Sequence, residues 1–256
     1  METPLNEKDA AAIPNAVYVF LKKNTFLVHD KDVYSPPTLA TMELKIYTSG
    51  EIEAYIKYRG GERKYGEYVQ CASEASEDFS QHLQQSDAEY VLLGIPEDIG
   101  IQVALEKKGA TSAWNATLDI LLNTQHNTLN RGNKLYILGH LVLEEELAIF
   151  NTLNLSEKED LKKAGELVAC IDKEVTYIIY KIVACGKKPI VIGGGHNNAY
   201  GIIKGCALGF HKPVNVVNFD TRPDFYPKKR RHNGNGFSYA FSEGFLQKYY
   251  IFGLYE

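Results

Sequence analysis

Residues 189–220 read PIVIGGGHNNAYGIIKGCALGFHKPVNVVNFD, and this stretch decides the fold. An apolar run ends in three consecutive glycines, a helix-compatible segment follows, and a second apolar run begins at Val214. Apolar runs without period-2 alternation are typical of strands buried on both faces, which is the pattern of a parallel sheet. The stretch therefore predicts strand, helix and strand in a parallel α/β arrangement.

The same strand-like pattern recurs along the chain, in apolar runs at 90–96, 134–139 and 249–253. Residues 156–185 have the apolar period of an amphipathic helix. Its start carries the S-x-x-E pattern of a capping box, Ser156 with Glu159, and Gly186 predicts its end. Strands that alternate with helices predict a doubly wound α/β fold.

The N-terminal third has a different character. Prolines and a Ser/Thr-rich stretch predict irregular structure over residues 1–41. We then expect β-like runs at 44–47 and 55–58 and a helix over 77–85, whereas the Asn-rich segment 123–133 predicts a loop. We therefore divide the chain into an N-terminal extension, residues 1–88, and an α/β domain, residues 89–256.

The composition and net charge of the chain limit the classes of partner that it could bind. The chain has 256 residues and a formal net charge of −4, which argues against a nucleic-acid binder. No apolar run is long enough to span a bilayer, and the N-terminus has no signal-peptide pattern. Four scattered cysteines without a CxxC pair indicate reduced thiols. We expect a cytoplasmic protein with no nucleic-acid or membrane partner; a homo-oligomer is left open.

The first candidate site is the glycine-rich segment 193–198, which follows a predicted strand and contains His196. Ligands of open parallel sheets bind beyond the carboxyl ends of the strands. A dinucleotide loop is disfavoured because Asn198 occupies the third glycine position of G-x-G-x-x-G, and there is no Gly-Lys-Ser/Thr of a phosphate loop. A nucleotide-binding module and a plain strand-to-helix turn both remain open.

The second candidate site is the segment DTRPD, residues 220–224, directly after another predicted strand. Asp220 and Asp224 at a strand end can converge on one cation, and with His196 they form an oxygen and nitrogen set suited to Mn²⁺ or a similar ion. The alternative is that Asp220 caps a turn and Asp224 is solvated. We predict that the three side chains lie within a few ångströms of one another at the carboxyl edge of the sheet.

Together these segments resemble the arginase-like ureohydrolase family, most closely its formimidoylglutamase branch. The resemblance covers about residues 91–256 and rests on four segments: GIPEDIG at 94–100, GGGHNNAYG at 193–201, NFDTRPDF at 218–225 and RHNGNGFSYAFSEG at 231–244. It implies a three-layer α/β/α sandwich with a mainly parallel sheet, from which C-terminal elements are missing here. It also implies a hydrolase that cleaves C–N bonds of linear amidines or guanidines, with formimidoylglutamate- or arginine-like substrates.

The resemblance further implies residue roles. A two-manganese site would supply hydroxide near neutral pH. His196, Asp220 and Asp224 match metal ligands of the family. Asn233, Gly234 and Asn235 match the loop that binds the amino-acid end of the substrate, and His232 precedes that loop, so His232, Asn233 and Asn235 are the candidate substrate-binding residues. No catalytic residue is assigned from the pattern.

Several departures qualify these roles. Arg222 stands at a degenerate ligand position, and a guanidinium has no lone pair to give a metal. We expect it to pair with Asp220 or Asp224. The later Ser-x-Asp-x-Asp motif of the family is absent, so we expect weak Mn²⁺ binding or none, and an inactive chain. A non-catalytic relative that lost the metals is the alternative to a hydrolase.

The basic run 228–231 predicts a solvated loop.

The resemblance also bears on the sheet. In the family, strands that would follow residue 256 lie between the strand at 189–193 and the strand at 214–220. Without them each strand would present an unpaired apolar edge, which natural proteins avoid. We therefore expect a gapped or distorted sheet, or a longer natural polypeptide.

Overall fold

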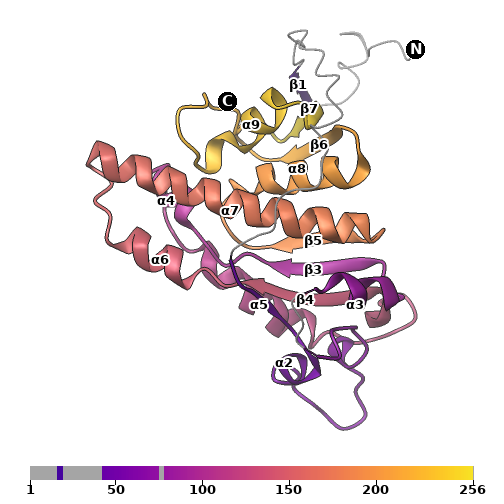
Figure 1. Cartoon of the computed structure of the whole chain (residues 1–256). Coiled ribbons are helices and arrows are strands. Elements are labelled where there is room, and N and C mark those ends of the chain that lie inside the picture. Colours follow the sequence, from indigo (N-terminus) through magenta and orange to yellow (C-terminus); the bar gives the residue numbers. More distant parts are fainter. Residues whose placement is uncertain (1–15, 20–41, 75–77, 256) are drawn as a thin grey trace, which may run out of the picture.

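The computed structural model describes residues 16–19, 42–74 and 78–255 of the chain. Its strands form two sheets, with the orders β2-β4-β3-β5 and β1-β7-β6 (Figure 1). The first sheet consists of β2 (Leu44–Ile46), β4 (Leu135–Leu141), β3 (Tyr90–Gly94) and β5 (Lys188–Ile192). The second consists of β1 (Ala16–Val19), β7 (Leu246–Phe252) and β6 (Val214–Phe219). The chain is thus α/β with mainly parallel pairing, as predicted.

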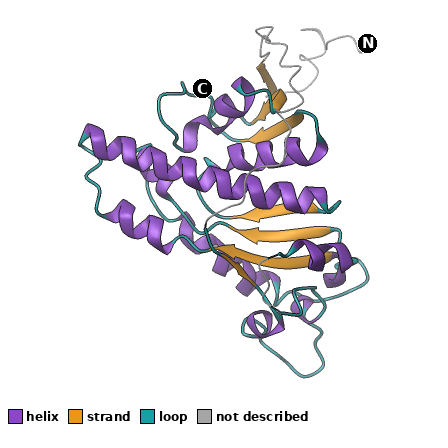
Figure 2. Cartoon of the chain, in the orientation of Figure 1, coloured by secondary structure: helices purple, strands orange, loops and turns teal. Residues whose placement is uncertain are grey.

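Helices alternate with these strands, as Figure 2 shows by colour. The α-helices are α2 (Ser49–Glu53), α3 (Ser80–Gln85), α4 (Ile99–Val103), α5 (Ala113–Leu121), α6 (Glu144–Asn151), α7 (Lys158–Ala184), α8 (Asn198–Phe210) and α9 (Gly236–Ser242). Short 3₁₀ turns are η2 (Tyr65–Glu67), η3 (Ala110–Ser112), η4 (Gly132–Lys134) and η5 (Asn233–Asn235).

The two central strands of the four-stranded sheet, β3 and β4, are covered on both faces. Strand β3 pairs in parallel with β4 on one side and β5 on the other, and β2 adds antiparallel to β4. Leu93 on one face packs with the apolar side of α7, whereas Leu92 on the other face packs with Trp114 of α5. The predicted burial on both faces is therefore confirmed for β3 and β4. Strand β2 brings part of the N-terminal segment into this sheet, and the domain boundary at residue 88 stays a prediction.

The three-stranded sheet is covered on one face only. Its inner face packs against α8 and α9 through residues such as Ile203 and Ile251. On the outer face Val217 is 56 % exposed and Phe219 is 77 % exposed. The predicted burial on both faces is wrong for β6 and β7, because no element in the described part of the chain packs on the outer face of this sheet. It is also wrong for β5 of the first sheet, in which every residue is exposed or half-buried.

The two sheets are not joined by any strand that the structure describes. Within the described ranges neither β5 nor β6 has a strand partner on the side that faces the other, so the expected gapped sheet is confirmed. An apolar groove of about 610 Å³ lies between them and is lined by both strands and α8. Edge strands of this kind are available for further pairing.

Helices α7 and α8 connect the two halves. A glycine ridge on α8, formed by Gly201, Gly205 and Gly209, allows close packing on α7. A Cβ built on Gly205 would lie 2.7 Å from the Cβ of Ile179, which is closer than real Cβ contacts. The absence of side chains on this ridge therefore sets the separation of the two helices.

Several predictions of local structure can be compared with the structure, and some of them are wrong. Residues 55–58 form no strand, since they follow the short helix α2 in irregular conformation. Helix α7 begins at Lys158 after Glu157, and no side-chain cap bond forms, so the predicted capping box is wrong. Gly186 ends the helix region with a φ of +74°, as its position predicts. Apart from β1, the prediction for residues 1–41 falls outside the described residues.

Among the helices described, none has the length and apolarity needed to cross a membrane.

Candidate metal centre

The loop between β5 and α8 presents His196 at the carboxyl edge of the first sheet. Gly193 and Gly194 adopt φ values of +86° and +80°, a region that favours glycine. A Cβ on Gly194 would also lie 2.3 Å from Nδ2 of Asn198. The glycine run therefore permits a sharp reversal that residues with side chains would obstruct.

Glu97 anchors this loop from the segment after β3. Its carboxylate is fully buried and accepts hydrogen bonds from the backbone N of Gly195 at 2.9 Å and from Nδ2 of Asn198 at 2.7 Å. It also accepts from Nδ2 of Asn197 at 3.1 Å and from the backbone N of Ile99 at 2.8 Å. Buried carboxylates are tolerated when they are saturated with donors in this way. The sequence-based assignment missed Glu97, although it lies in the quoted GIPEDIG segment as an acidic residue beside an apolar run.

Asp220 and Asp224 leave the end of β6 in a tight turn. The backbone N of Arg222 donates to Oδ1 of Asp220 at 3.0 Å. Asp224 has a φ of +43°, an uncommon left-handed conformation for a residue with a side chain. The turn directs both carboxylates back toward His196.

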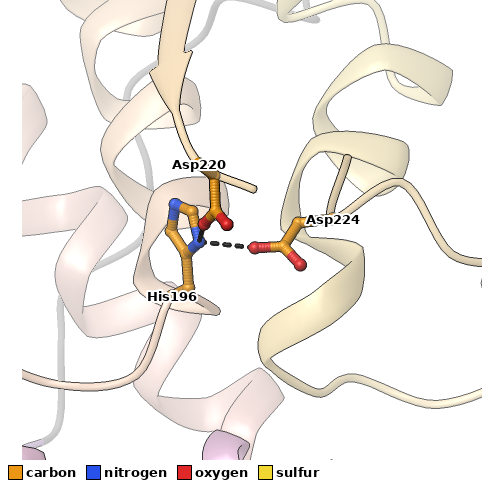
Figure 3. Close-up of side chains that lie close together, drawn as sticks. All are labelled: His196, Asp220 and Asp224. Atoms are coloured by element: carbon orange, nitrogen blue, oxygen red, sulfur yellow. Dashed lines mark hydrogen bonds and ion pairs between the residues drawn. The ribbon is translucent and has the colours of Figure 1, made fainter. Parts of the chain in front are cut away.

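The three predicted ligands converge (Figure 3). Nδ1 of His196 lies 2.6 Å from Oδ2 of Asp224 and 3.4 Å from Oδ2 of Asp220. The ligand atoms all lie within 4.8 Å of one another. The predicted convergence is therefore confirmed, and it joins the end of β5 in one sheet with the end of β6 in the other. The metal role of these residues stays a proposal.

The donor set fits one divalent cation. One imidazole nitrogen and two carboxylates suit an ion such as Mn²⁺. Oδ1 of Asp224 is buried and has no hydrogen-bond partner, which leaves an acceptor for a cation or donor. Within residues 42–74 and 78–255, these are the only three His, Cys, Asp or Glu side chains grouped closely enough for metal binding. The described residues therefore fit one ion and do not fit a two-ion cluster.

Arg222 takes a partner that the sequence-based prediction did not include. Its guanidinium contacts both carboxylate oxygens of Glu106, through Nη1 to Oε1 and through Nη2 to Oε2 at 3.4 Å. Its Nε lies 4.0 Å from Oδ1 of Asp224, at the outer limit of an ion pair. The predicted pairing with the aspartates is thus a minor contact. The bond to Arg222 lowers the pKa of Glu106.

The loop of His232, Asn233 and Asn235 lies next to this pair. Nδ2 of Asn233 donates to Oε2 of Glu106 at 2.7 Å, while Oδ1 of Asn233 is buried without a partner. Nδ1 of His232 accepts from the backbone N of Gly234 at 3.1 Å. Burial, followed by the charges of Arg230 and Arg231, lowers the pKa of His232.

Asn235 has a supporting position. Its side chain is fully buried, and Oδ1 accepts from Nη1 of Arg231 and from the backbone N of His232. Nδ2 donates to the carbonyl of Arg230 at 2.7 Å. These bonds hold the loop together, and the predicted substrate contacts of all three residues stay proposals.

Arg231 contradicts the prediction of a solvated basic run. Lys228 and Lys229 are exposed, but Arg231 is 5 % exposed and pairs with Asp172 of α7, with Nε 2.6 Å from Oδ2. Its guanidinium lies over the rings of Tyr200 and Tyr239. Burial raises the pKa of Asp172 to about 6, although Arg231 opposes that shift. A charged residue within the apolar stripe of α7 was the signal that could have revealed this pair.

Comparisons with known proteins point to one family. A family model described as the arginase family matches residues 88–256. A formimidoylglutamase from Chromobacterium violaceum is 30 % identical over 93 residues, which are 36 % of this chain and 30 % of the relative. One from Macrococcus caseolyticus is 29 % identical over 119 residues, 46 % of this chain and 36 % of the relative. The aligned chain thus spans about a third of these curated relatives.

A solved structure gives a similar picture of the fold. The crystal structure of formimidoylglutamase from Bacillus subtilis matches 74 % of this chain and 51 % of its own, with a TM-score of 0.50 and 16 % identity. A match at this identity shows the fold alone. Here too the chain spans about half the length of the protein it matches.

Proposed function

This chain is a member of the arginase family, and from that membership we propose that it hydrolyses the C–N bond of a linear amidine, with a formimidoylglutamate- or arginine-like substrate. The observation that carries the proposal is the convergence of His196, Asp220 and Asp224 at the carboxyl edge. The named relatives, both formimidoylglutamases, support the choice of substrate class.

The residues of the site suit a cationic reaction centre. Asp220 and Asp224 place two carboxylates within reach of His196, and Asp224 is only 1 % exposed. A Mn²⁺ ion held by these three side chains would supply Lewis acidity that activates water near neutral pH. The ring of Phe237 packs edge-on against His196 with 5.3 Å between centroids, which limits rotation of the imidazole and excludes water from one side.

The loop after Arg231 is the proposed position for the amino-acid end of the substrate. His232 and Asn233 lie beside the Arg222–Glu106 pair, and Oδ1 of Asn233 is free to accept a hydrogen bond. An α-ammonium group of the substrate is a suitable donor for that atom. Asn235, whose side chain is fully engaged within the loop, would orient the other two residues rather than contact substrate.

A second candidate function is that of a non-catalytic relative. It is favoured by the Arg222 guanidinium beside Asp224 and by the restriction to a single three-ligand group in the described part of the chain. Such a protein would keep the fold and bind an amidine or guanidine without turning it over. The two functions differ in whether product forms when metal is saturating.

A direct assay separates the two functions. The purified chain with saturating Mn²⁺ is incubated with formimidoylglutamate or arginine, and formamide or urea is measured. Turnover that is lost in Asp224→Asn and kept in Glu89→Gln, which alters an exposed pair with Lys134, supports the hydrolase. Bound metal and substrate without product would support the non-catalytic relative instead.

A further inference from the structure

Arg222 lies between two groups of carboxylates. On one side it contacts Glu106 through two nitrogens; on the other its Nε is 4.0 Å from Oδ1 of Asp224. Its backbone N is bonded to Asp220. A planar guanidinium pairs best with one carboxylate at a time in a two-bond arrangement. The side chain therefore has two competing partners, and Glu106 holds it in this structure.

The choice of partner changes the charge available to a cation. Asp220 and Asp224 carry two negative charges when ionised, and Arg222 would cancel one of them if it paired there. When Arg222 pairs with Glu106 instead, the Glu106 carboxylate neutralises the guanidinium and both aspartates keep their negative charge. Charges within about 4 Å interact strongly when partly removed from solvent, so the position of this one group decides how attractive the two aspartates are to a divalent ion.

Glu106 is itself held in place. Nδ2 of Asn233 donates to its Oε2 at 2.7 Å, and its backbone N donates to the carbonyl of Ile101 at 3.1 Å. The preceding residue, Leu105, has a φ of +62° and a side chain that is 75 % exposed. A left-handed leucine costs roughly 1 kcal/mol, and such outliers point to a positional requirement nearby. The turn after α4 thus aims Glu106 at Arg222.

We propose that Glu106 is a positioning residue that keeps the Arg222 guanidinium away from Asp220 and Asp224, so that these carboxylates and His196 can bind a single divalent cation. Arg222 acts in this scheme as a built-in competitor that Glu106 restrains. The inference deepens the metal site of the proposed function, but it concerns cation binding and needs no turnover.

The test is a double-mutant cycle with Mn²⁺ alone as the probe. Free Mn²⁺ is measured by electron paramagnetic resonance during titration of wild type, Glu106→Gln, Arg222→Gln and the double variant. We expect Glu106→Gln to weaken binding about tenfold, because the freed guanidinium turns to the aspartates. Arg222→Gln should bind more tightly than wild type, and the double variant should stay within about threefold of Arg222→Gln.

Other results would overturn the proposal. One is a Mn²⁺ affinity of Glu106→Gln that equals that of wild type. Another is a double variant that binds Mn²⁺ as weakly as Glu106→Gln does. The third is a wild-type chain that binds no Mn²⁺ up to about 10 mM. Thermal unfolding of each variant checks that the fold persists, and Glu89→Gln controls for the loss of one negative charge elsewhere. If the cycle behaves as expected and no product forms in the assay above, the hydrolase proposal fails and this inference stands.

Discussion

The two sheets contain similar apolar strands but differ in how much of them is buried. In β3 the side chains of Leu92 and Leu93 are almost fully covered on opposite faces, whereas in β6 Val217 and Phe219 face outward and are largely exposed. The difference lies in the surroundings: β3 has a strand on each side and helices on each face, while the described chain covers β6 on one face and one edge. An apolar run thus shows that a strand can be buried, and its packing partners decide whether it is.

The site depends on both regions. His196 follows β5 and the aspartates follow β6, and within the described residues these strands share no hydrogen bonds. Their separation is maintained by α7 against α8 and by the buried pair of Asp172 with Arg231, which reaches from α7 to the loop after β6. The geometry of the candidate metal centre therefore depends on helix packing more than on the sheet.

The largest expected effect contrasts one side chain from each sheet. Leu93→Ala removes a fully buried side chain from β3 and should lower the free energy of unfolding by about 3 kcal/mol. Val217→Ala in β6 should change it by less than about 0.5 kcal/mol, because that side chain is already 56 % exposed. Urea denaturation of both variants measures the difference. Equal losses would mean that the outer face of β6 is covered in solution.

A second prediction concerns the link between the halves. The pKa of Asp172 is raised by burial to about 6. An acid with a raised folded pKa binds more protons when folded, so its contribution to stability is present below its unfolded value near 3.8 and is lost as pH rises toward about 6. The full shift corresponds to a loss of at most about 3 kcal/mol. The free energy of unfolding of wild type and Asp172→Asn, measured by denaturation from pH 4 to pH 7, isolates the contribution of this carboxyl group. If the two free energies change in parallel with pH, the prediction is wrong.

A smaller effect is expected at the helix ridge. Gly205→Ala should destabilise by about 1 kcal/mol, because the clash with Ile179 exceeds the gain in helix propensity. The added methyl should also push α8 from α7 and weaken Mn²⁺ binding by separating His196 from the aspartates. Lys173→Ala on the exposed side of α7 is the matched control. Stabilisation by Gly205→Ala would show that the ridge is not tightly packed.

The smallest change is expected in the number of ions that the chain retains after Arg222 is replaced by a metal-binding residue. Arg222→His adds one imidazole, but the described residues supply no further carboxylates for a second ion. Metal analysis after dialysis should therefore show no more than about one manganese per chain, and the substitution alone should not raise hydrolysis toward that of a two-metal enzyme. Two retained ions in this variant would show that ligands lie outside the three residues named here.

Much of the fold and part of the site could be predicted from sequence because they depend on local patterns. The runs that became β3 to β7 and the stripe of α7 follow short-range periodicity. His196, Asp220 and Asp224 could be brought together in advance because the carboxyl ends of parallel strands share an edge. The capping box at Ser156 failed, since the helix begins two residues later and the serine is not its cap.

Other features could not be read in this way. Glu106 is 116 residues from Arg222 in the chain, and Asp172 is 59 residues from Arg231. The local sequence predicts other surroundings for both arginines. Arg222 has two aspartates within two residues of it, and Arg231 belongs to a run of four basic residues, which is a pattern typical of a solvated loop. Only the folded arrangement shows which carboxylate is within reach of which guanidinium.

The sequence by itself determined the order of strands and helices, the strand-end positions of the candidate ligands and the likeness to the arginase family, because each depends on neighbouring residues or on their spacing. Tertiary structure alone decided which faces of the strands are covered, that Arg231 is buried against Asp172, and that Glu106 holds Arg222. Burial and charge pairing are set by what approaches from elsewhere in the chain, and that information is spread over contacts too distant for any local pattern to encode.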